Sequence, residues 1–416
     1  MGFRKLKKIT DSISLFSITA LICAMSISIF SLKSRDAHFF SLYPCDKICQ
    51  IKGTVKSNPV ISSSRNFYRC ALEVEDCRTV SGYSTASGKI NILISKEIVE
   101  SHYPKKLYFD SGVPCIESGA ILDCEVVLLD EKERLFKADS IEFLDWNNKI
   151  SFFRAICRIN FKRLLAMWNN AGGFLLALLS ASKEYTEDIV SESFRLAGLS
   201  HILALSGMHV SIFSSTSQKL FKFSGKRITN LLSVLSVGLF VWFAGFSPSL
   251  TRALLGCLIS FILDVFCIKL KKIDSLCIAF LIQIMIFPSD FSSISFMLSY
   301  LALLGITLVS NPISIILSRF FGSYLGNSLS SSISAISFTG FLSARIFGFI
   351  SPIGVISTII ISPLVTLFLI MGLFCILLAL IFPFLSMPLG TILQILYYVI
   401  KQISIFFAKF EPIYIN

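Results

Sequence analysis

The stretch IGVISTIIISPLVTLFLIMGLFCILLALIF, residues 353–382, contains no charged side chain. A helix that crosses a membrane needs about 20 consecutive apolar residues, so this stretch predicts a span, either as one long tilted helix or as two elements. Similar apolar segments lie on both sides of it, several of them short or interrupted by Gly and Pro. With this stretch they predict about seven spans, the others being residues 230–246, 250–268, 274–288, 293–318, 326–344 and 385–408.

The composition supports a membrane protein. Hydrophobic residues make up 54% of the 416 residues and charged residues only 15%, whereas a soluble domain carries about a quarter charged residues. The net charge of +12 is unevenly distributed, because residues 33–150 hold 16 Lys+Arg and 17 Asp+Glu, and the rest of the chain holds 22 and 9. The simpler explanation of this basic excess is that the short cytoplasmic loops of a membrane protein are rich in Lys and Arg. The alternative explanation is a basic path for a polyanion.

The first segment of the chain predicts a membrane anchor. Residues 4–8 are basic, and the apolar run that follows, residues 13–32, is about 20 residues long and lacks a convincing cleavage site. We therefore expect residues 1–32 to form an uncleaved anchor with a cytoplasmic N-terminus. Residues 33–150, which lack any spanning segment, are then extracytoplasmic.

Residues 33–150 show the alternation that is typical of strands. Ile90, Ile92 and Ile94 alternate with less apolar neighbours, and residues 51–55 repeat the pattern. Five or six short strands in this length predict a small β barrel, with the OB type as the candidate fold. The expected fold class is thus an α-helical polytopic membrane protein with an N-terminal extracytoplasmic all-β (OB-like) domain.

Six of the twelve cysteines fall in this extracytoplasmic region. An even set in an exported domain predicts disulfides, and six cysteines allow 15 pairings among which the sequence does not choose. The closely spaced first pair is a weaker candidate for metal binding, because no second Cys or His pair accompanies it. We expect no metal site and no cofactor. The disulfide candidates are Cys45, Cys49, Cys70, Cys77, Cys115 and Cys124.

Residues 151–416 form the expected membrane domain, which opens with a basic amphipathic segment. Arg154, Arg158 and Lys162 recur at four-residue spacing, which predicts a helix lying along the membrane surface. A short helix then starts at Thr186, with Ile189, Phe194 and Ala197 on one face. The acids around its start fit helix-start chemistry better than a metal site; they are Glu184, Glu187, Asp188 and Glu192.

The most unusual segment is GLSHILALSGMHVSIF, residues 198–213. It is too short for an ordinary span, and its glycines and polar side chains favour a re-entrant or broken element that lines a cavity. His201, Ser206, Gly207 and His209 are therefore channel candidates. Ser206 and His209 would share a helix face, which leaves an intramembrane serine hydrolase as an alternative, although no third orienting acid is nearby.

This segment resembles the signature of the ComEC competence family. Three further motifs occur in the family's order, namely AGFSPSLTRALL at 244–255, SFMLSYLALLGI at 295–306 and the Ser-Pro-Leu block at 362–364. The short helix before the signature and the preceding β domain also occupy the places that the family gives them. The resemblance thus covers most of the chain.

The resemblance implies an inner-membrane channel that takes up single-stranded DNA during natural transformation. It implies an extracytoplasmic DNA receptor and a cytoplasmic ATPase as partners, and it leaves a homo-oligomer open. Many members also carry a metallo-β-lactamase-like domain with clustered His and Asp. The four histidines of this sequence, His38, His102, His201 and His209, form no such cluster, so we expect a member without that hydrolase and without enzymatic activity.

The remaining candidates for pore lining or DNA contact are charged residues and their aromatic neighbours. Arg252 and Arg345 interrupt apolar regions, where they either line a pore or extend to the lipid headgroups. Arg65, Phe67, Tyr68 and Arg69 are candidates for DNA contact in the β domain, against the simpler view that they are solvated strand residues. Besides the hydrolase, the open alternatives are a transporter of another anionic solute and a non-functional truncated paralogue.

Overall fold

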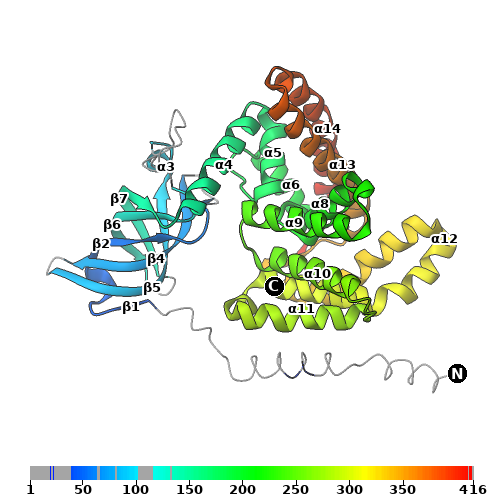
Figure 1. The fold of residues 1–416 in the computed structure, drawn as a ribbon, viewed down its shortest axis with the longest axis horizontal. Coiled ribbons are helices and arrows are strands. Elements are labelled where there is room, and N and C mark those ends of the chain that lie inside the picture. The colour runs from blue at the N-terminus through cyan, green and yellow to red at the C-terminus, as the bar shows by residue number, and fades with distance from the viewer. Residues whose placement is uncertain are drawn as a thin grey trace. The chain divides into compact units, whose positions relative to one another are not determined.

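The computed structural model describes residues 39–62, 66–79, 82–101, 116–131, 134–410 and 412–414, together with Thr19 and Ile22. An N-terminal mixed β-sheet domain is followed by long apolar helices, which confirms the expected class of polytopic membrane protein (Figure 1). The chain divides into two compact units, one of residues 35–186 and one of residues 1–34 and 187–416. The expected anchor, residues 1–32, lies outside the described residues except at Thr19 and Ile22.

Five strands of the first unit close into a ring. β2 pairs with β4, β4 with β5, β5 with β7, β7 with β6, and β6 with β2 again. The β5–β7 pairing is parallel and the others are antiparallel, so the sheet is mixed. Two short strands, β1 (Phe40–Ser41) and β3 (Val60–Ile61), add to its edges, and helix α3 (Lys96–Ser101) follows β5. The five strands are β2 (Ile48–Val55), β4 (Phe67–Thr79), β5 (Gly82–Ser95), β6 (Ala120–Asp130) and β7 (Leu135–Trp146).

Alternating side chains of these strands fill the interior. Ile90, Ile92 and Ile94 of β5 are buried together with Ile51 and Leu72, as strand alternation predicts. The barrel therefore has a continuous apolar core.

Helices α4 (Lys149–Ala166) and α5 (Asn169–Ser180) belong to this unit, which extends past the expected boundary at residue 150. The side chain of Asn148 caps α4 by accepting a hydrogen bond from the Ser151 N–H at 2.7 Å. Ala155 and Ile159 of α4 are part of the barrel core. α4 is thus packed against the β strands.

The basic face of α4 is buried, so the prediction that this face lies along a membrane surface was wrong. Arg158 donates from Nε to Glu117 Oε2 at 3.1 Å, and Lys162 donates to Glu117 Oε1 at 3.0 Å and to Glu184 Oε1 at 3.1 Å. The Glu117 side chain is 1% exposed. Burial raises the pKa of Glu117, but the adjoining Lys162 and Arg158 outweigh it and lower that pKa from 4.5 to about 2. Two carboxylates neutralise two cations here.

The second unit consists of helices and one small sheet, in which β8 (Phe349–Ile350) pairs with β9 (Ile413–Tyr414). Three 3₁₀ turns lie at Lys222–Ser224, Pro288–Ser292 and Pro383–Leu385. Its helices are α6 (Asp188–Leu196), α7 (Ser200–Leu203), α8 (Gly207–Leu220), α9 (Lys226–Ala244), α10 (Pro248–Val265), α11 (Lys272–Ile286), α12 (Ile294–Phe347), α13 (Gly354–Ile381) and α14 (Ser386–Ala408).

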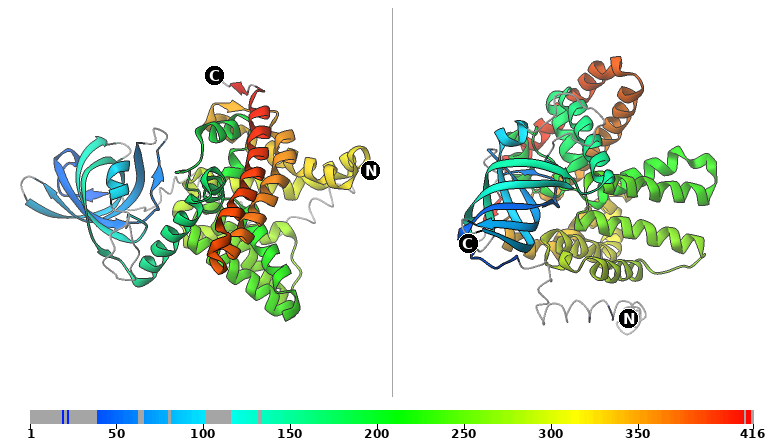
Figure 2. Two further views of the ribbon diagram at one scale, coloured as in Figure 1. Left: turned by 90° about the horizontal axis from the view of Figure 1, so that it is seen from above. Right: turned by 60° about the vertical axis from the view of Figure 1, so that its left-hand side comes forward.

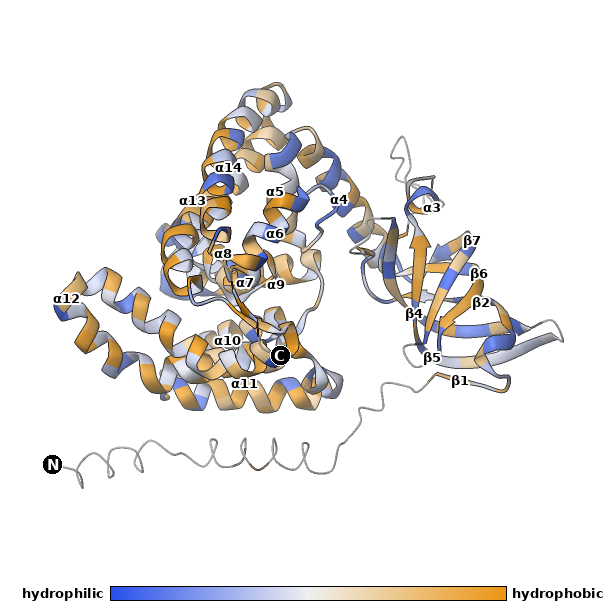
Figure 3. Ribbon diagram, turned by 180° about the vertical axis from the view of Figure 1, so that it is seen from behind, coloured by the Kyte–Doolittle hydropathy of each residue, from blue (hydrophilic) through white to orange (hydrophobic). Residues whose placement is uncertain are grey.

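In the described part of the chain, five helical segments are long and apolar enough to span a membrane: α9, α10, α12, α13 and Pro383–Ala408. Figure 3, which is coloured by hydropathy, shows hydrophobic residues along these helices. Residues 353–382 contain the single helix α13, with Pro363 inside it, and α13 runs beside α14 (Figure 2). α11, with 15 residues, is shorter than these.

Helix α12 is bent back on itself. Gly322 adopts φ 77° and ψ 166°, a conformation that only glycine adopts easily, and it separates an arm of residues 294–321 from one of residues 323–347. The arms pack closely, since a Cβ on Gly305 would lie 2.4 Å from the Ser334 carbonyl oxygen. These arms correspond to the two predicted segments 293–318 and 326–344.

Candidate functional site

The amphipathic helix α6 leads into the signature segment and is tied to α13. Ser357 Oγ donates to the Ala197 carbonyl oxygen at 2.8 Å, and Ser351 Oγ donates to that of Leu196 at 2.8 Å. Phe194 and Ala197 are buried as expected, whereas Ile189 is exposed and Val190 takes its place on the buried face. Two of the three predicted positions thus lie on the buried face, and Ile189 is misplaced by one residue.

The acids around α6 form ion pairs. Glu187 pairs with Lys401 of α14, and Glu192 pairs with Arg195. Within the residues described, no group of three or more His, Cys, Asp or Glu side chains is arranged to hold a metal ion. These carboxylates therefore have identified structural partners.

The signature segment is a broken helix. α7 ends at Leu203, Ala204 and Ser206 are extended, and α8 starts at Gly207. His201 is exposed on α7, with Nδ1 3.2 Å from the Gly198 carbonyl oxygen. The break places the first turn of α8 inside the unit, where His209 is fully buried.

Ser206 and His209 meet, and the contact is a helix cap. Ser206 is the N-cap of α8, its side chain accepts the backbone N–H of His209, and its own N–H donates to His209 Nδ1 at 3.2 Å. Because Nδ1 accepts this N–H, the neutral ring carries its proton on Nε2. Nε2 is buried and has no hydrogen-bond partner among the described residues. Capping thus accounts for the pair that suggested a hydrolase.

Arg252 lies directly against this first turn. A Cβ on Gly207 would be 2.6 Å from Arg252 Nη2, so a larger residue at this position would force the guanidinium to shift. Arg252 is 8% exposed and donates from Nη1 to the Ser299 carbonyl oxygen at 3.3 Å. Its Nε has no partner, and no carboxylate of the described chain forms an ion pair with it. Within the part of the chain that the structure describes, no carboxylate therefore neutralises the charge of Arg252.

A polar junction holds the start of α10 in place. Ser249 Oγ donates to the Leu205 carbonyl oxygen at 2.7 Å, which fixes α10 to the signature segment. Gln283 of α11, fully buried, donates to the Pro248 carbonyl oxygen at 3.0 Å and to Asp290 Oδ2 at 2.7 Å. Tyr300 Oη donates to Gln283 Oε1 at 3.0 Å. Sequence reasoning missed Gln283, although an amide within an apolar segment is itself a signal.

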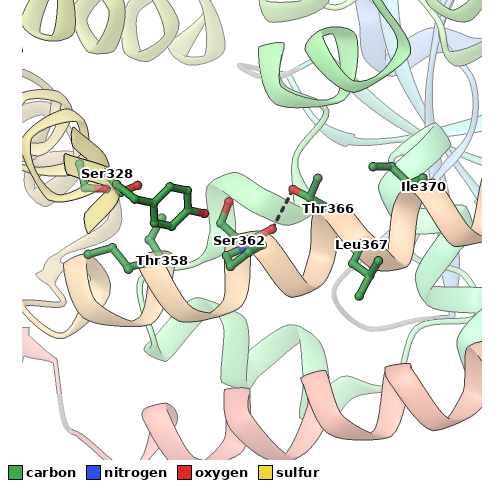
Figure 4. Close-up of a pocket in the computed structure, with 10 residues that line it drawn as sticks. Ser328, Thr358, Ser362, Thr366, Leu367 and Ile370 are labelled. Carbon is green, nitrogen blue, oxygen red and sulfur yellow. Dashed lines mark hydrogen bonds between the residues drawn. The ribbon is translucent and has the colours of Figure 1, made fainter. Parts of the chain in front are cut away.

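A cavity of about 410 Å³ lies between the second arm of α12 and α13. Each helix contributes three hydroxyl side chains at four-residue spacing, which places them on one face. Thr366 Oγ1 donates to the Ser362 carbonyl oxygen at 2.8 Å (Figure 4). Ser362 Oγ also contacts Met208 Sδ of α8 at 3.7 Å, so the cavity adjoins the signature. The hydroxyl residues are Tyr324, Ser328, Ser332, Thr358, Ser362 and Thr366.

The other predicted site residues belong to other elements of the chain. Arg345 is exposed in the last turn of α12, where a cation complements the helix dipole. In the β domain, Phe67 is half-buried and Arg69 exposed, while Arg65 lies outside the described residues. Tyr68 is 4% exposed inside the barrel, so its proposed contact with DNA was wrong, because alternation turns it toward the core.

The expected disulfides are absent among the described cysteines. Cys45, Cys49, Cys70, Cys77 and Cys124 are free thiols, and Cys115 lies outside the described residues. Seven residues along one extended strand separate Cys70 from Cys77, far beyond disulfide length. Burial in the barrel raises the pKa of Cys70 to about 12, so this thiol stays protonated and unreactive.

Comparison with known proteins finds a matching family model and a matching relative. Residues 178–415 match the family model described as "Competence protein". An uncharacterized protein of Aquifex aeolicus (strain VF5) is 29% identical over 242 residues, which cover 57% of this chain and 54% of the relative. The chain thus spans about half the length of that relative. No solved structure matches. The matched region contains the signature, Arg252, the polar junction and the hydroxyl-lined cavity.

Proposed function

The chain belongs to the competence protein family, which implies a role in DNA uptake, and we propose that it is the inner-membrane channel through which single-stranded DNA enters the cell. The observation that carries this proposal is the buried, unneutralised Arg252 within the family region. A buried cation without a carboxylate is costly in an apolar environment, and such residues typically mark a pathway for the opposite charge.

The chemistry of the helical unit suits a strand of any sequence. Single strands are held through backbone charge without reading of the bases, and hydroxyl groups can bond phosphate oxygens without adding a charge that would trap the strand. The cavity between α12 and α13 is lined by six hydroxyl side chains. Those of Thr358, Ser362 and Thr366 already donate hydrogen bonds, which leaves the three hydroxyls of α12 for this role. The chain would act as a conduit and not as an enzyme.

The β domain fits the same function. Its strand order, with β5 and β7 parallel and a helix after β5, supports an OB-like barrel, a fold that often binds single strands. The basic loops of the helical unit support an extracytoplasmic position for this domain. A DNA receptor outside and an ATPase inside would be the partners.

The test is uptake of labelled DNA by a transformable strain whose only copy of this family is this chain. Labelled single strands should reach the cytoplasm with the intact chain and be lost on its deletion. Arg252→Ala should abolish uptake at normal protein level, whereas Arg319→Ala, which removes an exposed cation of α12, should not. Absence of uptake with a correctly inserted chain and all partners present would refute the channel.

A further inference from the structure

The first turn of α8 together with Arg252 forms a cluster of buried donors. The first N–H groups of a helix have no partner within it and carry the positive end of the helix dipole. Arg252 Nη2 adjoins Gly207 in that turn, and Arg252 Nε is unpartnered. His209, the third residue of α8, is buried in the same turn, and its Nε2 has no partner among the described residues. The guanidinium and the positive end of the helix dipole thus lie against each other at Gly207.

This arrangement is unfavourable unless an anion completes it. A guanidinium against a helix N-terminus is repelled by the dipole, which prefers negative charge there. Ser206 already caps the backbone N–H of His209, so the first two N–H groups of α8 lie outside this cap. The geometry therefore points to a missing acceptor with several oxygen atoms. A phosphodiester has that chemistry, since helix N-termini and arginine both bind phosphate oxygens well.

We propose that Arg252 and the first turn of α8 form a phosphate-binding site that takes one phosphodiester of the DNA strand at a time. This inference rests on the proposed function, because it identifies the strand's backbone as the anion. The donors approach the phosphate from a protein interior that offers no carboxylate to Arg252 in the described chain. Binding through the phosphate alone leaves the bases unread, as a conduit requires.

The test measures binding of a fluorescent oligodeoxythymidylate to the purified full-length chain in detergent, by anisotropy, with inorganic phosphate as competitor. Arg252→Gln should weaken binding about tenfold or more and lower the salt-dependence slope by about one. Gly207→Ala keeps every charge, but its methyl group would displace the guanidinium, and it should weaken binding similarly. Gly256→Ala, one turn along α10 from Arg252 and with open space around its Cβ, should bind as the wild type does.

Two outcomes would overturn the site. One is oligonucleotide binding that Arg252→Gln and Gly207→Ala both leave unchanged, with folding verified by thermal unfolding. The other is stabilisation by phosphatidylglycerol added to the micelles, dependent on Arg252, without such an effect of oligonucleotide, which would make a lipid headgroup the occupant. Arg252-dependent oligonucleotide binding in a chain that supports no uptake would instead refute the channel and leave the site standing.

Discussion

Two regions of this molecule bury cations, and they treat them in opposite ways. In the β unit, Arg158 and Lys162 are buried against Glu117, and each of these three charges has a partner within 3.1 Å. In the helical unit, Arg252 is buried to a similar extent, yet among the described residues its only partner is a carbonyl oxygen at 3.3 Å. Paired buried ions hold elements together, whereas a buried cation that lacks its counter-ion is poised for an external one.

The comparison predicts the largest effect at Glu117. Replacing Glu117 with Gln leaves Arg158 and Lys162 buried without their common carboxylate, which should cost about 3–5 kcal/mol of unfolding free energy. Denaturant unfolding of the full chain, followed by tryptophan fluorescence, would measure it. Glu73→Gln, which removes the exposed ion pair with Lys56, should cost less than about 1 kcal/mol. If the two variants lost equal amounts of unfolding free energy, buried and exposed ion pairs would not differ in strength.

The same cluster predicts a pH dependence. The folded-state pKa of Glu117 is about 2 and its ordinary value is 4.5, so the native state binds its proton less readily than the unfolded state. The stabilisation that ionised Glu117 gives the folded state is therefore complete above pH 4.5 and is lost as the pH falls toward 2. The loss should be on the order of 3 kcal/mol.

Other carboxylates also titrate in this window, so the measurement is the difference between wild type and Glu117→Gln. Stability curves of the two chains should converge as the pH falls from 4.5 to 2. A constant difference across that interval would mean that Glu117 does not titrate there and that its ion pairs contribute little.

Replacing each buried arginine with methionine sharpens the comparison. Arg158→Met leaves Glu117 short of one partner and should destabilise the chain by about 3 kcal/mol. Arg252→Met removes a charge that has no counter-ion and should change stability by less than about 1 kcal/mol, while uptake is lost. Thermal unfolding of both variants measures the change in stability, and an uptake assay with labelled DNA measures the change in transport. A large loss of stability in Arg252→Met would show that Arg252 is a structural residue.

The sequence predicted elements better than it predicted their partners. Apolar length anticipated α9, α10, α13 and both arms of α12, and alternation anticipated the strands, because both signals are local. The parallel pairing of β5 with β7 and the contact of Arg158 with Glu117, 41 residues away, depend on how the chain folds. The four-residue spacing identified the basic face of α4, but it carried no information about which residues that face contacts.

At the candidate site, too, the sequence predicted some features and left others unpredicted. The spacing of Ser206 and His209 correctly predicted that they meet, but their role as a cap follows from the extended backbone at Ser206. Arg252 was a candidate because charges are rare in apolar segments. Its position against Gly207 could not be predicted, since it depends on the packing of α10 against α8.

The smallest predicted effect tests an intermediate case. The ion pair of Glu187 with Lys401 links α6 to α14, and its side chains are 23% and 21% exposed. Lys401→Met should cost about 1 kcal/mol, between the buried cluster and a solvated pair, because water still screens part of the attraction. Thermal unfolding would measure it, with Glu192→Gln, which breaks the more exposed pair with Arg195, as the control near zero. If Lys401→Met costs as much as Glu117→Gln, burial does not set the strength of these pairs, and the inference drawn from the bare charge of Arg252 loses its physical basis.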